Sequence, residues 1–527
     1  MSDRVEATAL GECEPPAKRH RCERRGTDRW EDEESEHFLE ELLNWPQLAK
    51  DGFEFLFDMH WNMAPNLQFW FDQQSTVNGP KLFVTTHYTG LGTVEHCMQR
   101  LVNAHNSAPV VFYSAHEICD DTRAVLMEAK HRPNHVFGDL THQFPSDVVK
   151  HMEMVVKVLR DRATTQMKAA GTPAAAKKIW EETSHRCMLK LLTVARETVQ
   201  AKKACQNGYC YVHDNFCPLW PETNDTDLVL EGAGNSCVSF SPQGSGGLWL
   251  HESAIVAAIW MVQTEARKVD MILQECSSRF NAKEAFQSAF PPEKGWKTTV
   301  LKLKCEDVGM PMVRWRNYSW TIRGPRLRLT WDFTRDDFLK VCQTPVQVDG
   351  HDFFCAPQDL VQDHLRRQVL TLRGTLQGHY AQALPFTAGL DVGTKVRLLS
   401  YQNLLGSLDN AEFVDKGMYG VVDLSQNCCV RQKLSKILPS FLTHSRLWSQ
   451  WKGREMIPLE MMLAMGWPVE GLVQNLGEDD TGCPWSMAYL GSVKSSLIAK
   501  VTGNQMHARV LGLFMAFCLS VTEVTSQ

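Results

Sequence analysis

From Lys81 onward the chain alternates between short apolar runs and amphipathic stretches, and this alternation limits the fold more than any other feature. The segment "KLFVTTHYTGLGTVEHCMQRLV" (81–102) is typical of a strand, a glycine-containing turn and a helix. "PVVFYSAHEICDDTRAVLMEA" (109–129) repeats the pattern, and "HVFGDLT" (135–141) follows as a shorter strand. Strands that alternate with helices predict a largely parallel sheet with helices on both faces.

Small and acidic residues come at the ends of these predicted strands. They are, in chain order, Gly90, Gly92, Glu117 and Asp139. A further buried strand, Val269–Leu273, resumes the alternation later in the chain and ends at Glu275. Because ligands of such sheets bind outside the carboxyl ends of the strands, the first four residues are candidates for one shared binding site.

Two regions interrupt the alternation. Residues 145–204 are rich in Lys, Ala and Met and are predicted to form a helical insertion. Residues 321–450 contain β-like runs ("LRLTWDF", "TKVRLLSY", "MYGVVDLS") and are predicted to form a second domain. About the last seventy residues return to helices and complete the first domain. They include Val510–Val521, which is too short to span a bilayer and is typical of a buried helix.

Composition sets broad limits on the class of protein. A chain of 527 residues is too long for one ordinary core and predicts about two to four folded units. We recognise no signal peptide, so the 17 cysteines are expected to be thiols, metal ligands or catalytic groups in a reducing compartment. The net charge of −6 does not indicate a general nucleic-acid binder. Residues 301–330, however, carry seven basic and two acidic side chains, and we expect phosphate contacts there.

The N-terminal residues 1–35 are polar and segregate their charges, a composition that does not bury enough apolar surface to order itself. Their basic cluster "KRHRCERR" (18–25) is either a nuclear-import signal or part of a solvated tail. We predict a nuclear location, with no membrane association.

Eight segments follow one another in a fixed order between about Leu82 and Gly512. They are "HYTGLGTVE", "HEICDDTRAVL", "GDL", "SCVSFSPQGSGG", "QECSSRF", "VGMPMVRWRNYSW", "REMIPLEMMLAMGWP" and "VTGNQMHARVLG". In this order, with a long region before the "MGWP" segment, they resemble the C5-cytosine DNA methyltransferase family. The resemblance implies an α/β fold with a Rossmann-like, S-adenosylmethionine-dependent methyltransferase domain. It also implies a smaller, mixed β-rich target-recognition domain.

The resemblance divides the chain into four parts. These are a polar, partly disordered N-terminal segment (1–75), a catalytic domain (76–320) with a helical, cysteine-rich insertion (145–230), a target-recognition domain (321–453), and a C-terminal return to the catalytic domain (454–527).

S-adenosyl-L-methionine is the cofactor that the resemblance implies. Glu117 would contact its ribose, Asp139 its adenine, and Asn504 would lie near its methionine end. The complete set of implied cofactor-binding residues is Tyr88, Gly90, Gly92, Glu117, Asp139, Leu140 and Asn504. Tyr88 stands near the position where the family usually carries a Phe, and His87 is the other candidate to replace it.

Four residues fall on the family's catalytic positions: Cys237 as the nucleophile, Glu275 as the acid, and the paired Arg314 and Arg316. C5 of cytosine is a poor nucleophile, and a thiolate that adds at C6 makes it reactive. An acid beside N3 stabilises the charge that builds on the ring, and arginines hold the base and lower the pKa of the thiol. Because C6 lies inside the duplex stack, the cytosine must be flipped into a pocket.

Three residues depart from the family pattern. Ser236 replaces the Pro before the nucleophile, Cys276 replaces the Asn after the acid, and Met312 replaces the Gln of the arginine strand. Cytosine-5 methylation of DNA, with DNA as the partner, is the function that we predict. Two alternatives stay open: the same reaction on transfer RNA, or a catalytically decayed relic that still binds cofactor or DNA.

A second cluster of cysteines lies in the insertion, where "CQNGYCYVHDNFC" brings four candidate zinc ligands together. They are Cys205, Cys210, His213 and Cys217. Such residues can hold zinc tetrahedrally, but their spacing matches no zinc finger that we can name. Chance clustering is the better explanation in a chain with 17 cysteines, and we predict no metal.

Overall fold

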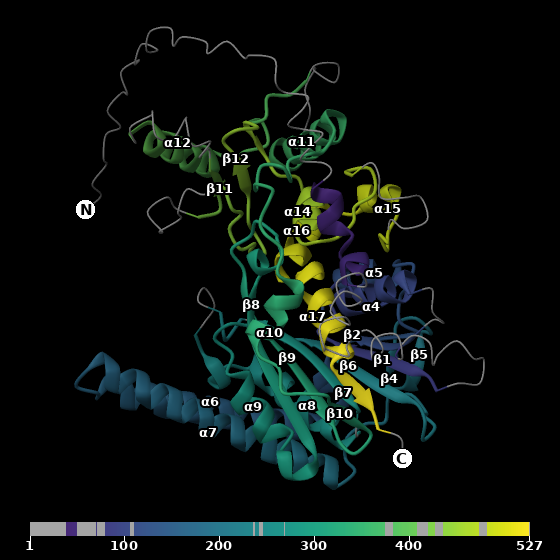
Figure 1. The fold of residues 1–527 in the computed structure, drawn as a ribbon. Helices are drawn as coiled ribbons and strands as arrows, with labels where there is room; N and C mark the ends of the chain where they lie inside the picture. Colours follow the sequence, from purple (N-terminus) through teal and green to yellow (C-terminus); the bar gives the residue numbers. More distant parts are fainter. Residues whose placement is uncertain are drawn as a thin grey trace.

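We describe the fold from a computed structural model of the chain (Figure 1). The structure describes residues 38–49, 70, 80–105, 110–235, 238–241, 246–267, 269–374, 383–407, 420–426, 436–473 and 482–525. The basic cluster at 18–25 lies outside these residues.

A nine-stranded sheet forms the centre of the described structure, in the order β5-β4-β3-β2-β1-β6-β7-β9-β8. Its strands are β1 (Leu82–His87), β2 (Val111–His116), β3 (His135–Phe137), β4 (Asn207–Cys210), β5 (Asn215–Pro218), β6 (Leu228–Gly234), β7 (Met271–Ser277), β8 (Trp296–Lys304) and β9 (Trp315–Arg323). The five strands from β3 to β7 are parallel, whereas the pairs at both edges are antiparallel. Strand order reverses between β1 and β6, which makes this junction the switch point of a doubly wound sheet. The predicted Rossmann-like α/β fold is confirmed.

Helices cover both faces of the sheet because its strands are apolar on both sides. Leu82 and Val84 of β1 belong to one core, and Phe83 between them belongs to the other. The first core lies under α4 (Thr93–Ala104) and the C-terminal α17 (Ala508–Ser520), which contact each other. The second core lies under α8 (Ser253–Ala266) and α9 (Ala282–Ala289).

The predicted helical insertion is a pair of long helices, α6 (Ser146–Lys168) and α7 (Pro173–Gln200), visible at the lower left of Figure 1. Thr172 caps the start of α7 through its side chain, and Pro173 occupies the first turn, where its missing N–H costs nothing. The buried side chains of α7 recur at helical spacing and pack on α6 and α8. The strands β4 and β5 then form a hairpin that extends the sheet beyond β3.

The region between β9 and the C-terminal helices (324–457), called the second region below, contains both helices and strands. Its elements are β10 (Leu327–Leu329), α10 (Arg335–Cys342), α11 (Gln358–Arg373), α12 (Val392–Ser407), β11 (Val421–Asp423), β12 (Leu447–Ser449) and β13 (Arg454–Glu455). The run "TKVRLLSY", predicted to be β-like, instead lies within α12. Asp391 accepts a hydrogen bond from the Thr394 N–H (2.8 Å) at the start of this helix, and Leu398 and Tyr401 are buried one turn apart. The described part of this region is therefore less β-rich than expected.

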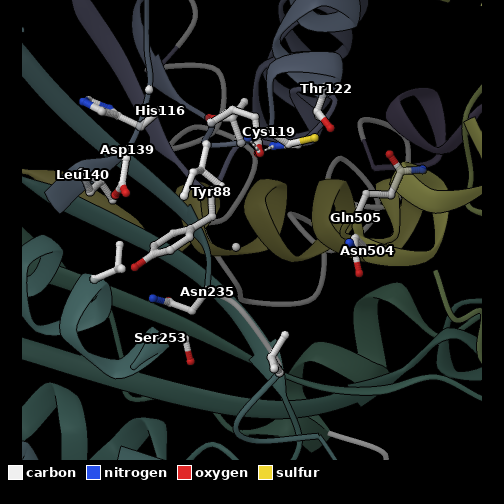
Figure 2. Close-up of a pocket in the computed structure, with 18 of the residues that line it drawn as sticks. Tyr88, His116, Cys119, Thr122, Asp139, Leu140, Asn235, Ser253, Asn504 and Gln505 are labelled. Carbon is white, nitrogen blue, oxygen red and sulfur yellow. Dashed lines mark hydrogen bonds between the residues drawn. The ribbon is translucent and has the colours of Figure 1, made fainter. Parts of the chain in front are cut away.

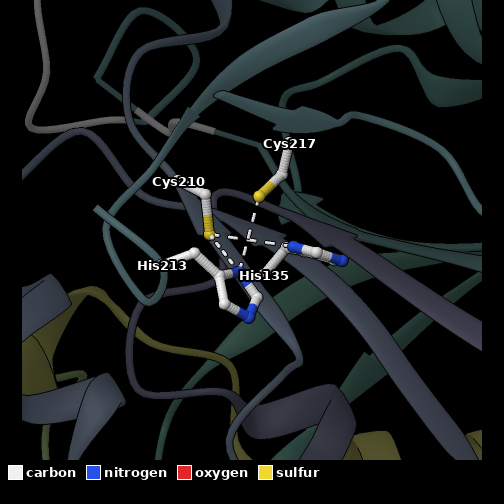
Figure 3. A group of neighbouring side chains, drawn as sticks. All are labelled: His135, Cys210, His213 and Cys217. Atoms are coloured by element: carbon white, nitrogen blue, oxygen red, sulfur yellow. Dashed lines mark hydrogen bonds between the residues drawn. The ribbon is translucent and has the colours of Figure 1, made fainter. Parts of the chain in front are cut away.

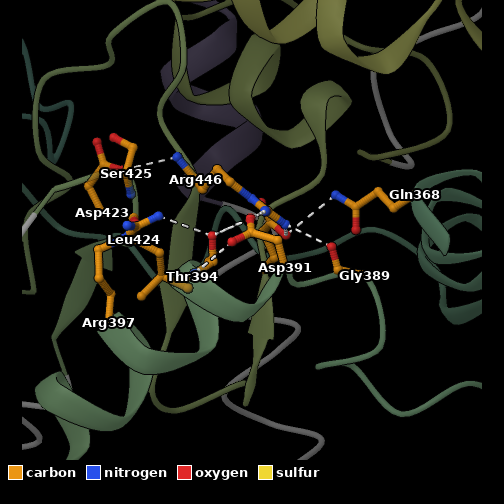
Figure 4. A network of polar contacts seen from close by, with 10 residues as sticks. Gln368, Gly389, Asp391, Thr394, Arg397, Asp423, Leu424, Ser425 and Arg446 are labelled. Atoms are coloured by element: carbon orange, nitrogen blue, oxygen red, sulfur yellow. Dashed lines mark hydrogen bonds and ion pairs between the residues drawn. The ribbon is translucent and has the colours of Figure 1, made fainter. Parts of the chain in front are cut away.

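A network around Arg446 holds the far end of this region together (Figure 4). Its Nε and Nη2 atoms each donate to a carboxylate oxygen of Glu455 at 2.7 Å. The guanidinium also contacts Asp391 (3.2 Å), the carbonyl of Gly389 (3.1 Å) and the hydroxyl of Thr394 (3.5 Å). One guanidinium thus joins the start of α12 to β13.

The chain returns to the large sheet through α14 (Pro458–Ala464), α15 (Met487–Ser492) and α16 (Ser495–Asn504), which precede α17. In Figure 1, α14 and α16 lie between the second region and the sheet. The α17 helix is buried along its whole length, as expected for the apolar run, and β14 (Thr522–Val524) pairs with β10. Each helix in the described ranges is too short or too polar to traverse a bilayer.

The boundaries of the four predicted parts stay a prediction. Near the boundary at residue 321, β9 continues to Arg323, and α10 contacts both α17 and β8. The first residues of the expected second domain therefore pack against the large sheet.

Candidate active site

A cavity of about 650 Å³ opens at the carboxyl ends of β1, β2, β3 and β6, next to the switch point (Figure 2). Its volume is in the range of sites for small molecules and cofactors. Nine of the predicted site residues line it: Tyr88, Gly90, Glu117, Asp139, Leu140, Glu275, Arg314, Arg316 and Asn504. Residues that are up to about 400 positions apart in the sequence, and that were predicted to form the site, therefore line one cavity.

The loop after β1 forms one wall because its backbone turns sharply. Tyr88 (φ 55°), Gly90 (φ 58°) and Gly92 (φ 80°) all adopt left-handed conformations, which glycine does without strain. Gly92 precedes α4 and is not among the residues that line the cavity, so its contact with a cofactor stays a prediction. The hydroxyl of Tyr88 is buried, and burial raises the pKa of Tyr88 well above its usual value. Tyr88 therefore presents a neutral hydroxyl.

Glu117, immediately after β2, is held by the backbone on both sides. Its Oε2 accepts a hydrogen bond from the Gly90 N–H (3.0 Å), and its Oε1 accepts one from the Cys119 N–H (2.9 Å). Two donors fix the carboxylate while each oxygen keeps a further lone pair. Such a group is suited to accept hydrogen bonds from neighbouring hydroxyls of a ligand.

Asp139 and Leu140 form the cavity wall after β3. The Asp139 carboxylate accepts a hydrogen bond from the Thr141 N–H (2.9 Å) and caps the short 3-10 helix Leu140–Gln143. Leu140 is buried and gives this wall an apolar surface. A capped turn next to an apolar side chain suits a flat ring that carries polar edges.

The opposite wall comes from the end of α16, where Asn504 and Gln505 lie across the cavity from Asp139 (Figure 2). Both polar atoms of the Gln505 side chain and the Nδ2 atom of Asn235 are buried with no hydrogen-bond partner in the described part of the chain. Buried polar groups are costly without partners. These orphaned groups, together with Glu117 and Asp139, fit a polar ligand such as S-adenosylmethionine.

An acid and two arginines form the end of the cavity nearest β7. Arg316 Nε lies 2.9 Å from Glu275 Oε1. Arg314 is almost fully buried and donates from Nη2 to the Gln505 carbonyl (2.6 Å), while its Nε and Nη1 find no partner among the described residues. Burial, and then the like charge of Arg316, lower the pKa of Arg314. The site therefore offers hydrogen-bond donors that favour an electron-rich ligand.

Cys237 and Ser236 lie outside the described residues. The described residues on either side, Asn235 and Val238, both line the cavity. Asn235 Oδ1 accepts a hydrogen bond from Gln274 Nε2 (2.9 Å), and Gln274 Oε1 accepts one from the Ser319 hydroxyl (3.1 Å). Asn235 is thus fixed from β7 and β9.

The other two departures from the family pattern lie in packed surroundings. The Cys276 thiol donates to the carbonyl of Asn235 (3.8 Å), so this position still contacts the loop that leads to Cys237. Met312 is fully buried in the first core and pairs with Leu438 of the second region through a β-bridge. An apolar side chain suits that position, because the strand leading to Arg314 passes through the core there.

Sequence reasoning missed several residues that line the cavity, among them His116, Asn235, Ser253 and Gln505. Asn235 and Gln505 are sequence neighbours of predicted residues, and this adjacency was the available signal. Ser253 begins α8, and nothing in its local sequence distinguishes it from an ordinary helix start.

No protein-family model and no curated protein sequence matches the chain. Among solved structures it is similar to the Dnmt2 methyltransferase of S. pombe (TM-score 0.37, 11% identity, covering 83% of this chain and 98% of that chain). It is similar to a DNMT2 mutant of Spodoptera frugiperda (TM-score 0.35, 11% identity, covering 83% of this chain and 99% of that chain). It is also similar to the Entamoeba histolytica methyltransferase EhMeth (TM-score 0.37, 9% identity, covering 83% of this chain and 98% of that chain). The chain resembles methyltransferases in structure. At these identities and TM-scores, its chemistry has to be argued from its own residues.

Proposed function

We propose that this protein is a methyltransferase that uses S-adenosylmethionine and acts on C5 of cytosine in DNA. One observation carries the proposal. A single cavity joins two acids at strand ends, Glu117 and Asp139, to a buried acid with two arginines, Glu275, Arg314 and Arg316. The first group suits a nucleoside cofactor, and the second suits an electron-rich heterocycle that gains charge during a reaction.

The cofactor would occupy the part of the cavity beside the switch point. Glu117 would accept hydrogen bonds from the ribose hydroxyls, Asp139 and Leu140 would contact the adenine, and Asn504 would lie toward the methionine end. When bound, S-adenosylmethionine supplies an electrophilic methyl group on a sulfonium sulfur. The unpaired amide groups of Gln505 and Asn235 would gain partners in that complex.

The residues near β7 would activate the base. The Cys237 thiolate would form a bond to C6 of a flipped cytosine, and the electron pair displaced from the C5–C6 double bond makes C5 nucleophilic. Glu275 would donate a proton or a strong hydrogen bond at N3, and Arg316 would hold that carboxyl group in place. After methylation, transfer of the C5 proton to solvent would restore the double bond and expel the thiolate, and S-adenosylhomocysteine would be the other product.

Basic residues near this site support a nucleic-acid substrate. The ammonium groups of Lys302 and Lys304 lie 5.4 and 5.7 Å from the centre of the Trp315 ring, and this ring stands between Arg314 and Arg316 in sequence. Trp315 is exposed, so the group offers both cations and an aromatic face. We include a nuclear location and DNA as the partner in the proposal.

The test uses full-length protein, tritiated S-adenosylmethionine and duplex DNA of mixed sequence. We expect label on DNA with the wild type and a loss of at least about a hundredfold with Cys237→Ala and Glu275→Gln. Cys205→Ala, which changes an exposed cysteine outside the cavity, is the matched control and should keep the wild-type rate. DNA containing 5-fluorocytosine should trap the wild type covalently but not Cys237→Ala.

Two results would contradict the proposal. Label on transfer RNA but not on DNA would assign the same chemistry to RNA. Cofactor binding in calorimetry, with no label on either nucleic acid, would leave a binding protein that has lost the reaction.

A further inference from the structure

Two histidines and two cysteines converge at the edge of the large sheet (Figure 3), and none of the four lines the cavity. His135 is on β3, Cys210 ends β4, His213 is in the hairpin turn, and Cys217 is on β5. One potential ligand atom from each residue lies within 4.8 Å of every other. Sequence spacing had grouped Cys205 with the last three, but Cys205 is exposed and is not part of the cluster.

Three sulfur-to-nitrogen distances inside this cluster are close to those of a tetrahedral metal site. Cys210 Sγ lies 3.8 Å from His135 Nδ1 and 3.5 Å from His213 Nδ1, and Cys217 Sγ lies 3.4 Å from His213 Nδ1. A tetrahedral zinc ion with ordinary bonds to sulfur and nitrogen separates these ligand atoms by about 3.6 Å. The three sulfur-to-nitrogen distances are therefore close to those that one such ion requires.

We propose that His135, Cys210, His213 and Cys217 bind one structural Zn²⁺ ion. Two thiolates and two imidazoles make a complete set of four soft and borderline ligands, which leaves no open position for catalysis. Hard cations such as Mg²⁺ and Ca²⁺ prefer oxygen ligands, and the cluster provides none. The proposal replaces our expectation of no metal and exchanges one of the ligands suggested by the sequence, Cys205, for His135.

The ion would fasten the β4–β5 hairpin to the sheet. The structure pairs β3 with β4 at one position, Phe137 with Cys210, so this edge has little backbone pairing of its own. A metal bonded to His135 on β3 and to three residues of the hairpin would add a second connection between the hairpin and the sheet. Zinc sites of this closed kind contribute directly to folding free energy.

The hairpin in turn supports the cavity wall after β3. Tyr211, in the hairpin turn, donates from its backbone N–H to the Val136 carbonyl (2.8 Å). The centre of its ring lies 4.0 Å from the Arg123 guanidinium, and the ring lies beside Gly138, where a Cβ would be in ordinary van der Waals contact with it at 3.4 Å. Gly138 precedes Asp139, so loss of the metal should loosen the wall that we assign to the adenine.

The first experiment measures the metal itself. Full-length protein, purified without chelators, should contain about one zinc per chain by inductively coupled plasma mass spectrometry. Cys210→Ser and His135→Ala should lose most of it, whereas the matched control Cys205→Ser should keep it. Wild-type protein loaded with Co²⁺ should show thiolate-to-cobalt charge-transfer absorption and the intense visible bands of a tetrahedral site. Because this spectrum is measured on the wild type, it does not depend on whether a variant folds.

Zinc-free wild-type protein that also gives no cobalt–thiolate spectrum would overturn the proposal. A Cys210–Cys217 disulfide in protein purified under reducing conditions would overturn it too. Zinc loss from Cys205→Ser, together with retained zinc in His135→Ala, would return Cys205 to the ligand set and remove His135. These readouts are independent of methyl transfer, so the metal site can fail or stand separately from the proposed function.

Discussion

At the residue scale, Glu95 gives the clearest pH dependence. It lies in the first turn of α4, is almost fully buried, and accepts a hydrogen bond from the Thr86 hydroxyl. Burial raises the pKa of Glu95 from 4.5 to about 7. The folded state therefore binds a proton that the unfolded chain has released, so this contribution to stability is complete below about pH 4.5 and is lost as pH rises to about 7.

Glu95→Gln should remove this pH dependence, because the amide stays neutral in both states. As pH rises from 4.5 to 7, the free energy of unfolding of the wild type should fall by about 3 kcal/mol relative to that of the variant. Thermal unfolding midpoints across this range measure the difference. Glu128→Gln, which changes an exposed carboxylate, is the control, and parallel curves for wild type and Glu95→Gln would contradict the prediction.

At the element scale, the Arg446 network predicts how the second region is held together. Arg446→Met leaves Glu455 and Asp391 without the guanidinium that pairs with them, at a cost of about 2 to 3 kcal/mol for this partly exposed site. Hydrogen exchange should then speed up in α12 and β13 but not in the central sheet. Glu455→Met added to Arg446→Met should recover part of the loss, because it removes a stranded charge.

The matched control for this network is Arg373→Met, which changes an exposed arginine at the end of α11 and should have an effect of less than about 0.5 kcal/mol. If Arg446→Met and Arg373→Met lose the same stability, the network does not hold the region together.

The sequence predicted β1, β2, β3 and their terminal residues well, because strand runs, glycine turns and amphipathic helices are local signals. It misassigned the "TKVRLLSY" run as β-like, although the Asp391 cap and the one-turn spacing of Leu398 and Tyr401 favour a helix. The sequence also did not reveal that His135 lies next to Cys210. These two residues are 75 positions apart and meet only because β3 pairs with β4.

At the scale of the whole molecule, the second region contacts the part of the chain that carries the large sheet, beside two cavity residues. The Val313 N–H donates to the Leu438 carbonyl (2.9 Å), directly before Arg314. Gly503 packs against the backbone of Leu442, directly before Asn504. A region expected to recognise the target therefore contacts the backbone next to cavity residues on both sides of the cavity. These contacts could couple target binding in the second region to the position of the cavity walls.

This arrangement makes Gly503 a sensitive position. A Cβ at Gly503 would lie 2.3 Å from the Leu442 carbonyl oxygen, so Gly503→Ala has to displace either the second region or the end of α16 that carries Asn504 and Gln505. Overpacking of this size costs about 1 to 3 kcal/mol, and we expect S-adenosylmethionine to bind about tenfold more weakly in calorimetry, with a lower melting temperature. Gly491→Ala in α15 is the matched control, because a Cβ there meets nothing within 4 Å. A Gly503→Ala protein that melts and binds like this control would show that the contact between the regions does not position the cavity wall.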